Sequence, residues 1–480
     1  MITGERMAQV DANAEALGVP RKQLMESSGN AVAREARRVA DPGDRVVIVA
    51  GRGNNGGDAF VAARFLDEYD ATTLLLGRPE NVSTDIAREN WEALQQGEYD
   101  TRVVRDSAGL DLPDADVVVD AMLGTGVSGA LREPAATAAR AINAADATVV
   151  SVDVPSGLDA GTGDLPALHV DPDRVVTFHD TKPGLDALDA EVTVADIGIP
   201  TAAQQFVGPG DLLALGRNPD SHKGDHGEVL VIGGGPYTGA PALAARAALR
   251  GGADLVRVAC PAAVAREVQG YEESLIVREL TGERFGPSDV EPALDVAGEH
   301  DAVVLGPGLG DAPETLDAAS AFLGGFDGTA VVDADALQVV PDVDTDATLI
   351  CTPHQGELVG MGGETADDWR ERAGLVEEFA ADLGAVLLVK GRHDVISDGE
   401  TTRVNRTGNP GMTVGGTGDV LAGVTGAQAS TLDPLDAAAV GAYVNGRAGD
   451  LAREEVGGFG LLATDLPEFV PAATWGGDDD

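Results

Sequence analysis

From residue 45 onward, short apolar runs rich in β-branched residues alternate with Ala-rich stretches of helical character. This alternation predicts parallel sheets covered by helices on both faces, so we expect an α/β fold throughout. In the first half the expected strands are 45–50, 72–77, 115–121, 148–154, 174–179 and 191–197. In the second half they are 227–235, 254–259, 301–308, 329–335, 348–353 and 385–391, with a strand-like pair at 393–398 and 401–406.

The length of 480 residues suits two or three domains. Between 198 and 226 the apolar runs give way to Gly, Pro and Asp, which is typical of a linker. We therefore expect a boundary near residue 213. A Rossmann-like three-layer domain would occupy residues 1–213, and a larger α/β domain would occupy residues 214–480.

The charge balance is strongly acidic, with 33 Lys and Arg against 80 Asp and Glu, giving −47 at neutral pH. This excludes a general nucleic-acid binder, because nothing would neutralise phosphates along a strand. Self-repulsion of this size is screened by concentrated salt, which predicts a halophilic cytoplasm; a mildly acidic mesophilic protein is the alternative. The amino terminus lacks a signal-peptide pattern and no run approaches the ~18 apolar residues of a membrane span, so we expect a cytoplasmic location without membrane partners.

Three polar loops follow expected strands of the first half: GRGNNGGDAF, VVDAMLGTGVSGA and VDVPSGLD. Loops at the carboxyl ends of neighbouring parallel strands converge where such sheets bind ligands. Asn55, Asp120 and Ser156 offer only oxygen ligands, which suit a hard cation such as sodium or potassium. Asp153 is a candidate general acid/base, and a helix or turn cap is the alternative role.

These three motifs, in this order and spacing, resemble the NAD(P)H-hydrate epimerase domain over about residues 1–213. The resemblance implies potassium at Asn55, Asp120 and Ser156, and Asp153 as the acid/base at the hydrated nicotinamide. A departure is MESSG at 25–29, where relatives more often read MExAG. The residues implied to bind hydrated NADH or NADPH are Asn54, Asn55, Gly56, Gly57, Asp58, Gly124, Thr125, Gly126, Val127, Ser128, Gly129, Ala130 and Asp153.

In the second half, NRTGNPGMTVGGTGDVLAGV ends in a glycine-rich loop followed by Asp419 at an expected helix start. Backbone N–H groups there can neutralise a moving phosphoryl group while the carboxylate accepts a proton. The alternative is a glycine-rich helix start merely capped by Asp419. His354 is equally open to a structural or a catalytic role. His222 and His226, four residues apart in the linker, favour a solvated loop over a zinc site.

HKGDHGEVLVIGGGPYTGAPALAARAALRGGADLVRVA, TPHQGE and NPGMTVGGTGD together are similar to the ADP-dependent NAD(P)H-hydrate dehydratase, a ribokinase-like fold, over about residues 214–480. The resemblance implies that Asp419 deprotonates the hydroxyl of the hydrate and that ADP phosphorylates it. Phosphate then leaves, and AMP is the other by-product. Asp394 stands where relatives often have Thr, and Mg²⁺ is expected on general phosphoryl-transfer grounds. The implied contacts are Ala253, Gly308, His354 and Asp419 for the hydrate, Lys390, Gly391, Arg392, His393 and Asp394 for ADP, and Gly418 for its AMP part.

The two halves together predict a bifunctional repair enzyme that epimerises hydrated NADH or NADPH and dehydrates the S form with ADP. The alternatives are a ribokinase-like kinase of a vitamin precursor or sugar, and a non-catalytic nucleotide-binding first domain. The resemblance suggests a homo-oligomer. The sequence leaves open ADP against ATP, NADH against NADPH, and the orientation of the two sites.

Overall fold

The computed structural model describes residues 1–126, 129–216 and 220–476. Contacts divide the chain into two compact units, Met1–Ala203 and Gln204–Asp480, ten residues before the boundary expected from the sequence (213 − 203). The linker joins the second unit from Gln204 onward, where Phe206 forms a bridge to Val404 and Val207 N donates to Val404 O at 3.0 Å.

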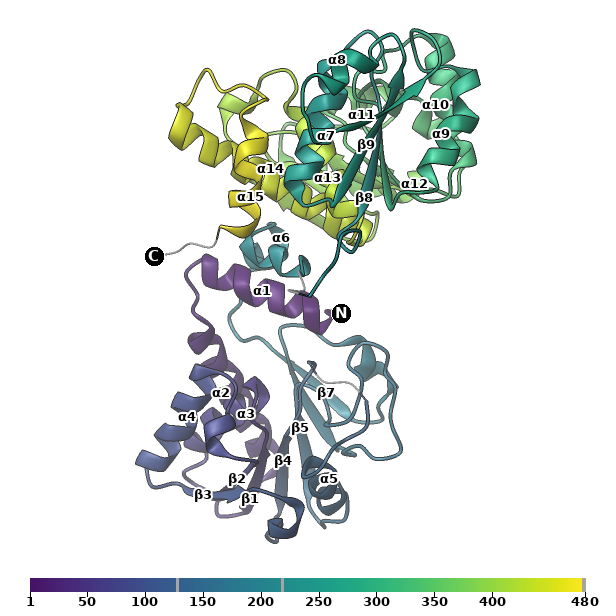
Figure 1. The fold of residues 1–480 in the computed structure, drawn as a ribbon. Coiled ribbons are helices and arrows are strands. Elements are labelled where there is room, and N and C mark those ends of the chain that lie inside the picture. The colour runs from purple at the N-terminus through teal and green to yellow at the C-terminus, as the bar shows by residue number, and fades with distance from the viewer. Residues whose placement is uncertain (127–128, 217–219, 477–480) are drawn as a thin grey trace. The chain divides into compact units, whose positions relative to one another are not determined.

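The first unit contains one seven-stranded sheet in which every neighbouring pair is parallel (Figure 1). The strand order is β3-β2-β1-β4-β5-β6-β7, with the switch in direction at β1 and β4. The strands are β1 Arg45–Ala50, β2 Asp70–Leu76, β3 Asp100–Val104, β4 Val117–Ala121, β5 Thr148–Val152, β6 Arg174–Phe178 and β7 Glu191–Ala195.

Helices cover both faces of this sheet because its central strands are apolar on both sides. Val46 and Ile48 of β1 pack into the core beneath α1 to α4, whereas Val47 and Val49 pack into the core beneath α5. The α-helices are α1 Gly4–Ala16, α2 Arg21–Val39, α3 Asn54–Arg64, α4 Asp85–Gln96, α5 Ala135–Asn143 and α6 Thr201–Gln205, which crosses the unit boundary. Short 3₁₀ turns are η1 Pro79–Asn81, η2 Ser107–Gly109 and η3 Pro183–Ala187.

The second unit contains a nine-stranded sheet in the order β10-β9-β8-β11-β12-β13-β14-β15-β16. It is parallel from β10 to β14, and β15 and β16 add two antiparallel strands at one edge. The strands are β8 Glu228–Ile232, β9 Leu255–Pro261, β10 Ile276–Leu280, β11 Ala302–Leu305, β12 Thr329–Val332, β13 Thr348–Cys351, β14 Val386–Val389, β15 Asp394–Ser397 and β16 Thr402–Asn405.

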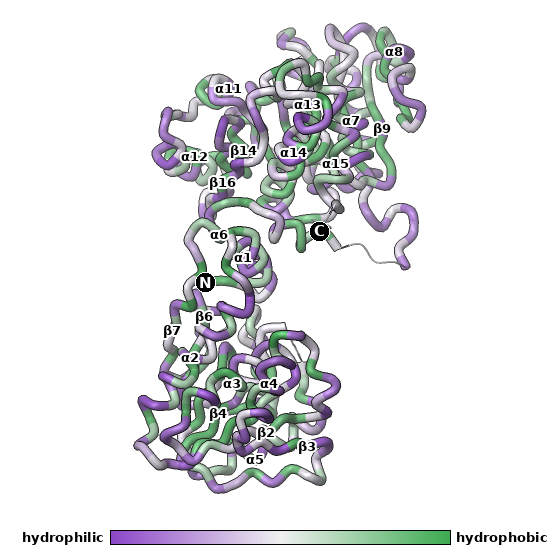
Figure 2. Tube along the Cα trace, turned by 90° about the vertical axis from the view of Figure 1, so that its left-hand side faces the viewer, coloured by the Kyte–Doolittle hydropathy of each residue, from purple (hydrophilic) through white to green (hydrophobic). Residues whose placement is uncertain are grey.

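Alternate residues of β8 again face opposite cores: Val229 and Val231 pack with α7, α13 and α14, and Leu230 and Ile232 pack with α9, α10 and α12. Figure 2 shows the apolar residues gathered along the strands, and most polar residues in the outer loops. The α-helices are α7 Gly239–Gly251, α8 Ala265–Gln269, α9 Val290–Ala297, α10 Pro313–Gly325, α11 Gln355–Gly360, α12 Trp369–Leu383, α13 Thr417–Ala429, α14 Pro434–Val456 and α15 Leu466–Trp475. The 3₁₀ segments are η4 Pro209–Ala214, η5 Pro287–Asp289, η6 Ala334–Asp342 and η7 Pro410–Met412.

The α/β fold expected in both halves is confirmed, and each expected strand is present with slightly different ends. Two edge strands, β3 and β10, were not predicted. Both carry charged residues and are largely exposed, so neither shows the buried apolar pattern that marks the central strands. No helix among the described residues is both long enough and apolar enough to cross a membrane.

Candidate functional site

The carboxyl ends of β1, β4 and β5 lie side by side because these strands are neighbours in the sheet. The register pairs Val49 with Asp120, and Asp120 with Ser151. A Cβ atom at Gly51 would stand 1.8 Å from the Met122 carbonyl oxygen, so only glycine lets the first two loops approach so closely. The structure therefore brings together the three polar loops of the first unit.

Asp120 is the buried centre of these loops. Its side chain is fully buried, and its carboxylate accepts hydrogen bonds from Ser156 Oγ at 2.6 Å, Ser156 N at 2.8 Å and Ser151 Oγ at 3.0 Å. Burial raises the pKa of Asp120, and the hydrogen bonds from Ser156 oppose the rise. No basic side chain of the described residues pairs with this carboxylate, so only neutral donors surround its charge.

The other two candidate potassium ligands meet at Leu123. Asn55 Nδ2 donates to Leu123 O at 2.9 Å, and Leu123 N donates to Ser156 Oγ at 3.0 Å. Asn55, Asp120 and Ser156 thus lie in one place, and their oxygen donors suit a hard cation. The described residues contain no group of three or more His, Cys, Asp or Glu side chains that could hold a metal.

The NNGGD segment forms the start of α3, where Gly56, Gly57 and Asp58 are buried. Asn54 is exposed and accepts a hydrogen bond from Thr84 Oγ1 at 2.9 Å. The neighbouring loop, Gly124 to Ala130, is described only in part, and Val127 and Ser128 lie outside the described residues. Its described members are Gly124, Thr125, Gly126, Gly129 and Ala130.

Asp153 directly follows β5 and has a left-handed backbone with φ of +64°. Its Oδ1 atom lies 3.1 Å from Lys182 Nζ and accepts a hydrogen bond from Thr177 Oγ1 at 3.0 Å. Lys182 is only 1% exposed and also donates to the backbone oxygens of Phe178 and Asp180. A strained backbone and a fully buried lysine at one carboxylate are unusual and cluster at functional sites.

Sequence reasoning missed Lys182. The available signal was its rarity, since Lys22, Lys182, Lys223 and Lys390 are the only lysines among 33 basic residues. Its pairing with Asp153 could not be read from the sequence, because β6 has to lie beside β5 first.

The charge of Asp153 acts on two further carboxyl groups, Asp11 and Asp58. Burial raises the pKa of Asp11 to about 6, and Lys182 opposes that rise while Asp153 adds to it. Burial likewise raises the pKa of Asp58 well above its ordinary value, with Asp153 and Asp11 adding to the effect. A carboxylate paired with a lysine and a neighbouring carboxyl that retains its proton form a suitable acid/base pair.

In the second unit, the GGTGD run forms the start of α13, and Gly416 is its left-handed N-cap with φ of +97°. Asp419 lies in the first turn. Burial raises the pKa of Asp419 to about 7; the Asp333 carboxylate adds to the rise and Lys390 opposes it. A carboxyl that titrates near neutral pH beside the free N–H groups of a helix start suits proton transfer coupled to phosphoryl transfer.

Lys390 follows β14 and contacts carboxylates that follow two other strands, β12 and β13. Its Nζ lies 2.8 Å from Asp333 Oδ1 and 3.7 Å from Glu357 Oε2. Asp333 is 3% exposed and also accepts a hydrogen bond from Thr352 Oγ1 at 2.8 Å. Burial acts against the charge of Lys390, but the Asp333, Glu357 and Asp419 carboxylates together raise its pKa. Neither Asp333 nor Glu357 was assigned a role from the sequence.

Gly418 is packed beneath this lysine: a Cβ atom there would lie 3.4 Å from Lys390 Nζ. Gly308, after β11, has φ of +75°, and a Cβ atom would approach Tyr237 O to 2.5 Å. His354 caps α11, because its Nδ1 accepts from Glu357 N at 3.0 Å while Glu357 Oε2 accepts from His354 N at 2.7 Å. Gly308, His354 and Lys390 thus follow the carboxyl ends of β11, β13 and β14, and Gly418 and Asp419 lie beside Lys390 in the first turn of α13.

Ala253 does not lie with them. It precedes β9, and α7 runs beside α13 so that Leu243 contacts Gly416 while Gly251 contacts Ala427. Ala253 therefore sits near the last turn of α13, which is about 18 Å long from its first turn to its last. Ala253 thus lies at the amino end of β9, and the hydrate contact expected there stays a prediction.

The loop from Lys390 to His393 is held from inside by Asp394. Asp394 Oδ1 accepts from Gly391 N at 2.9 Å, and Oδ2 accepts from Asn405 Nδ2 at 2.9 Å. Burial raises the pKa of Asp394 to about 6. Both carboxylate oxygens are thus engaged within the unit, whereas Gly391 and Arg392 are exposed.

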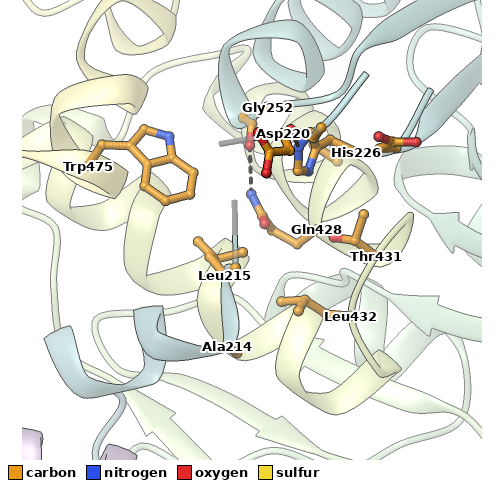
Figure 3. Close-up of a pocket in the computed structure, with 14 residues that line it drawn as sticks. Ala214, Leu215, Asp220, His226, Gly252, Gln428, Thr431, Leu432 and Trp475 are labelled. Atoms are coloured by element: carbon orange, nitrogen blue, oxygen red, sulfur yellow. Dashed lines mark hydrogen bonds between the residues drawn. The ribbon is translucent and has the colours of Figure 1, made fainter. Parts of the chain in front are cut away.

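One pocket of about 400 Å³ lies elsewhere in the second unit (Figure 3). Trp475, Leu215 and Leu432 form apolar parts of its wall, and Gln428 Nε2 donates across it to Gly251 O at 3.1 Å. It is lined by the last turns of α7 and α13, so it lies at the opposite end of these helices from Asp419. His226 lines this pocket together with Asp220 and Asp225.

Comparison with known proteins agrees with two separate sites. Residues 229–472 match the family described as NAD(P)H-hydrate dehydratase, and residues 21–184 match the YjeF-related protein N-terminus. The bifunctional NAD(P)H-hydrate repair enzyme Nnr of Methanothermobacter thermautotrophicus is 44% identical, over 97% of this chain and 94% of that protein. The Archaeoglobus fulgidus enzyme of the same name is 43% identical over 98% of both chains. The chain belongs to the bifunctional NAD(P)H-hydrate repair enzymes.

The second unit of this repair enzyme also resembles a solved dehydratase. The ADP/ATP-dependent NAD(P)H-hydrate dehydratase of Bacillus subtilis, co-crystallised with ATP/Mg²⁺, is similar with a TM-score of 0.50 and 27% identity. The match covers 56% of this chain and 97% of that protein. The expected combination of an epimerase domain with a dehydratase domain is therefore confirmed, and the kinase alternative is not supported.

Proposed function

We propose that the first unit interconverts the R and S forms of hydrated NADH and NADPH at Asp153, and that the second unit dehydrates the S form with ADP at Asp419. The single observation that carries the dehydratase assignment is the Asp419 carboxyl, whose pKa burial raises to about 7 at a helix start beside Lys390. The residues proposed to contact the hydrate are the described members of Asn54 to Asp58 and of Gly124 to Ala130 with Asp153 in the first unit, and Ala253, Gly308, His354 and Asp419 in the second. Val127 and Ser128 belong to the same proposal from the sequence alone.

In the first unit, epimerisation requires the hydroxyl on the reduced ring to leave and return on the other face. The ring nitrogen can expel it if a nearby acid supplies a proton. Asp58, whose pKa is raised by burial, is a proton source, and Asp153, held beside Lys182, is a proton acceptor. As water adds to the other face of the ring, Asp153 accepts its proton, and transfer of that proton from Asp153 to Asp58 restores both groups.

In the second unit, Asp419 accepts the proton of the hydrate's hydroxyl as that oxygen attacks the β-phosphorus of ADP. The bond from this phosphorus to the bridging oxygen breaks and AMP leaves. The ring nitrogen then expels phosphate, and loss of a ring proton restores the double bond of NADH or NADPH. The sum is hydrate plus ADP giving the reduced nucleotide, AMP and phosphate. Lys390 to Asp394 and Gly418 are proposed to bind the nucleotide, and within this loop Asp394 also bonds to Gly391 N and Asn405 Nδ2.

Cations complete the proposal. Asp120 is a buried carboxylate with only neutral donors, so a potassium ion held by Asn55, Asp120 and Ser156 would compensate its charge and order the loops. Mg²⁺ would neutralise charge on the nucleotide phosphates and keep most of its ligands as water. The B. subtilis relative was crystallised with ATP and Mg²⁺, so ATP is tested beside ADP. We also propose a homo-oligomer in a salt-rich cytoplasm.

The test supplies purified R and S hydrates of NADH with ADP, ATP or no nucleotide, in concentrated potassium chloride with magnesium, and follows the absorbance of NADH. We expect the S form to be consumed with ADP, and the R form to be consumed only while Asp153 is intact. Asp419→Asn should lower the rate on both forms by about 10²–10⁴. If neither form reacts with either nucleotide, the proposal is wrong. If Asp153→Asn leaves R-form conversion unchanged, the first unit is a scaffold.

A further inference from the structure

An arginine cluster surrounds His393 in the loop that begins at Lys390. The backbone oxygen of His393 accepts a hydrogen bond from Arg372 Nη2 at 3.0 Å. The ring of Trp369 lies 5.7 Å from that of His393, and the Arg370 guanidinium lies 4.4 Å above the Trp369 ring. We define the arginine cluster as Arg370, Arg372, Arg392 and Arg406.

Three of these arginines carry charges that the protein leaves largely uncompensated. The side chain of Arg370 is 71% exposed and has only a loose contact of 3.9 Å with Asp368. Arg392 and Arg406 are exposed, and neither forms an ion pair with a carboxylate of the described residues. Burial lowers the pKa of His393, and all four arginines lower it further with no opposing carboxylate.

What distinguishes Arg370, Arg392 and Arg406 is that they gather around one residue, His393, in a chain with 80 acidic and 33 basic residues. At low ionic strength a net charge of −47 repels nucleotides, which are themselves anionic. A local group of arginines would favour the approach of such a substrate.

An aromatic column, formed by Phe206 and Trp369, contacts two of the arginines, Arg370 and Arg406. The Arg406 guanidinium lies 4.6 Å over the Phe206 ring, and the ring centroids of Phe206 and Trp369 are 5.5 Å apart. Trp369 in turn contacts His393 and Arg370. Stacked guanidinium groups keep their planar edges available for bidentate contact with phosphate.

The cluster adjoins the proposed catalytic centre. Lys390 contacts Asp333 at that centre, and His393 lies three residues further along the loop, which spans at most about 11 Å. The one carboxylate of this loop, Asp394, accepts hydrogen bonds from Gly391 N and Asn405 Nδ2 within the unit. Ligands that approach Lys390 over the exposed side of this loop therefore meet the arginines.

We propose that Arg370, Arg392 and Arg406 form an anion-capture site for the phosphates of a nucleoside diphosphate on its way to Asp419. This inference rests on the proposed use of ADP by the second unit. It adds Arg370 and Arg406, which lie outside the loop assigned to ADP from the sequence.

The experiment measures nucleotide binding separately from turnover, using the full chain. Trp369 fluorescence reports binding, and Trp369→Phe identifies which part of the signal belongs to it. ADP, NADH and inorganic phosphate are titrated separately into the wild type and into Arg370→Gln/Arg406→Gln. Arg278→Gln is the matched control, because Arg278 is an exposed arginine on β10, at the opposite edge of the same sheet.

We expect the double variant to bind ADP about tenfold more weakly, or about 1.4 kcal/mol, and the difference to shrink as the Debye length falls to about 3 Å at 1 M salt. KM for ADP should rise more than kcat falls, Arg278→Gln should behave as wild type, and Arg370→Lys/Arg406→Lys should regain part of the affinity. Inorganic phosphate should compete weakly.

The inference is overturned if the folded double variant binds ADP as the wild type does, or if only its thermal stability falls, because the column would then merely anchor Phe206. It is also overturned if NADH, and not ADP, changes Trp369 fluorescence. In either outcome, continued turnover of the S hydrate with ADP leaves the proposed function standing, whereas loss of all turnover in the wild type refutes that function instead.

Discussion

Replacing Lys182 by methionine tests whether the first unit depends on its buried ion pair. Lys182 Nζ contacts Asp153 Oδ1 at 3.1 Å, Phe178 O at 2.9 Å and Asp180 O at 3.1 Å, with 1% of the residue exposed. Methionine retains the volume but leaves these acceptors without their donor. Removing one member of a buried pair costs about 3–5 kcal/mol, so we expect the free energy of unfolding to fall toward the lower end of this range, since Asp153 remains 16% exposed.

The effect on catalysis should be larger than the effect on stability. Without Lys182, the Asp153 carboxylate would face Asp11 and Asp58 with no counter-charge, and its function as an acid/base would be impaired. We expect R-form conversion to fall by about 10²–10⁴. Lys182→Arg keeps the charge and should recover part of the activity.

The assay has an internal control, because the S form reacts in the second unit without epimerisation. The ratio of NADH formation from the R and S hydrates, each with ADP, isolates the first unit in a single preparation. Asp153→Asn gives the background from spontaneous epimerisation. A folded Lys182→Met protein with the wild-type ratio would refute the reasoning.

Four further outcomes are expected. Because only ionised Asp419 accepts a proton and burial raises its pKa to about 7, kcat for the S form should rise through pH 7, and Asp419→Asn should abolish this step; a flat wild-type profile would contradict it. Burial raises the pKa of Asp394 from 3.8 to about 6 in the folded protein, so its contribution to stability is complete below pH 3.8 and is lost as the pH rises through 6. Between these two pH values, the free energy of unfolding of Asp394→Thr, measured by chemical unfolding, should gain about 3 kcal/mol relative to that of the wild type. Asp120→Asn should weaken the potassium dependence of R-form conversion, measured at constant ionic strength with lithium as the balancing cation. Thermal unfolding should shift upward from low to molar potassium chloride, because a charge of −47 is then screened; an unchanged midpoint would contradict the halophilic prediction.

The buried features of the fold could be predicted from the sequence. Strands such as β1 and β8 are apolar on both faces, so their runs identify them without knowledge of their neighbours. Edge strands β3 and β10 could not be found in this way, because one side of each is left to solvent and to charged residues. The contact-based unit boundary likewise depends on Val207 pairing with Val404, almost two hundred residues later.

Candidate site residues could be predicted where one segment contains both the glycine-rich loop and its carboxylate. NNGGD and GGTGD are of this kind, since the helix start and the functional group are local. The sequence could not show that Lys182 reaches Asp153 or that Lys390 reaches Asp333, because each contact requires two strands to be adjacent.

The sequence by itself thus determined the α/β class, the loops that carry chemistry and the strongly acidic surface. Only the tertiary structure decided which charges meet. The packing of helices on strands brings Asp11, Asp58, Asp153 and Lys182 together and gathers four arginines around His393. The physical reason is that local sequence fixes whether a strand or helix forms, whereas the pKa and the partner of a side chain depend on burial and on charges brought from distant segments.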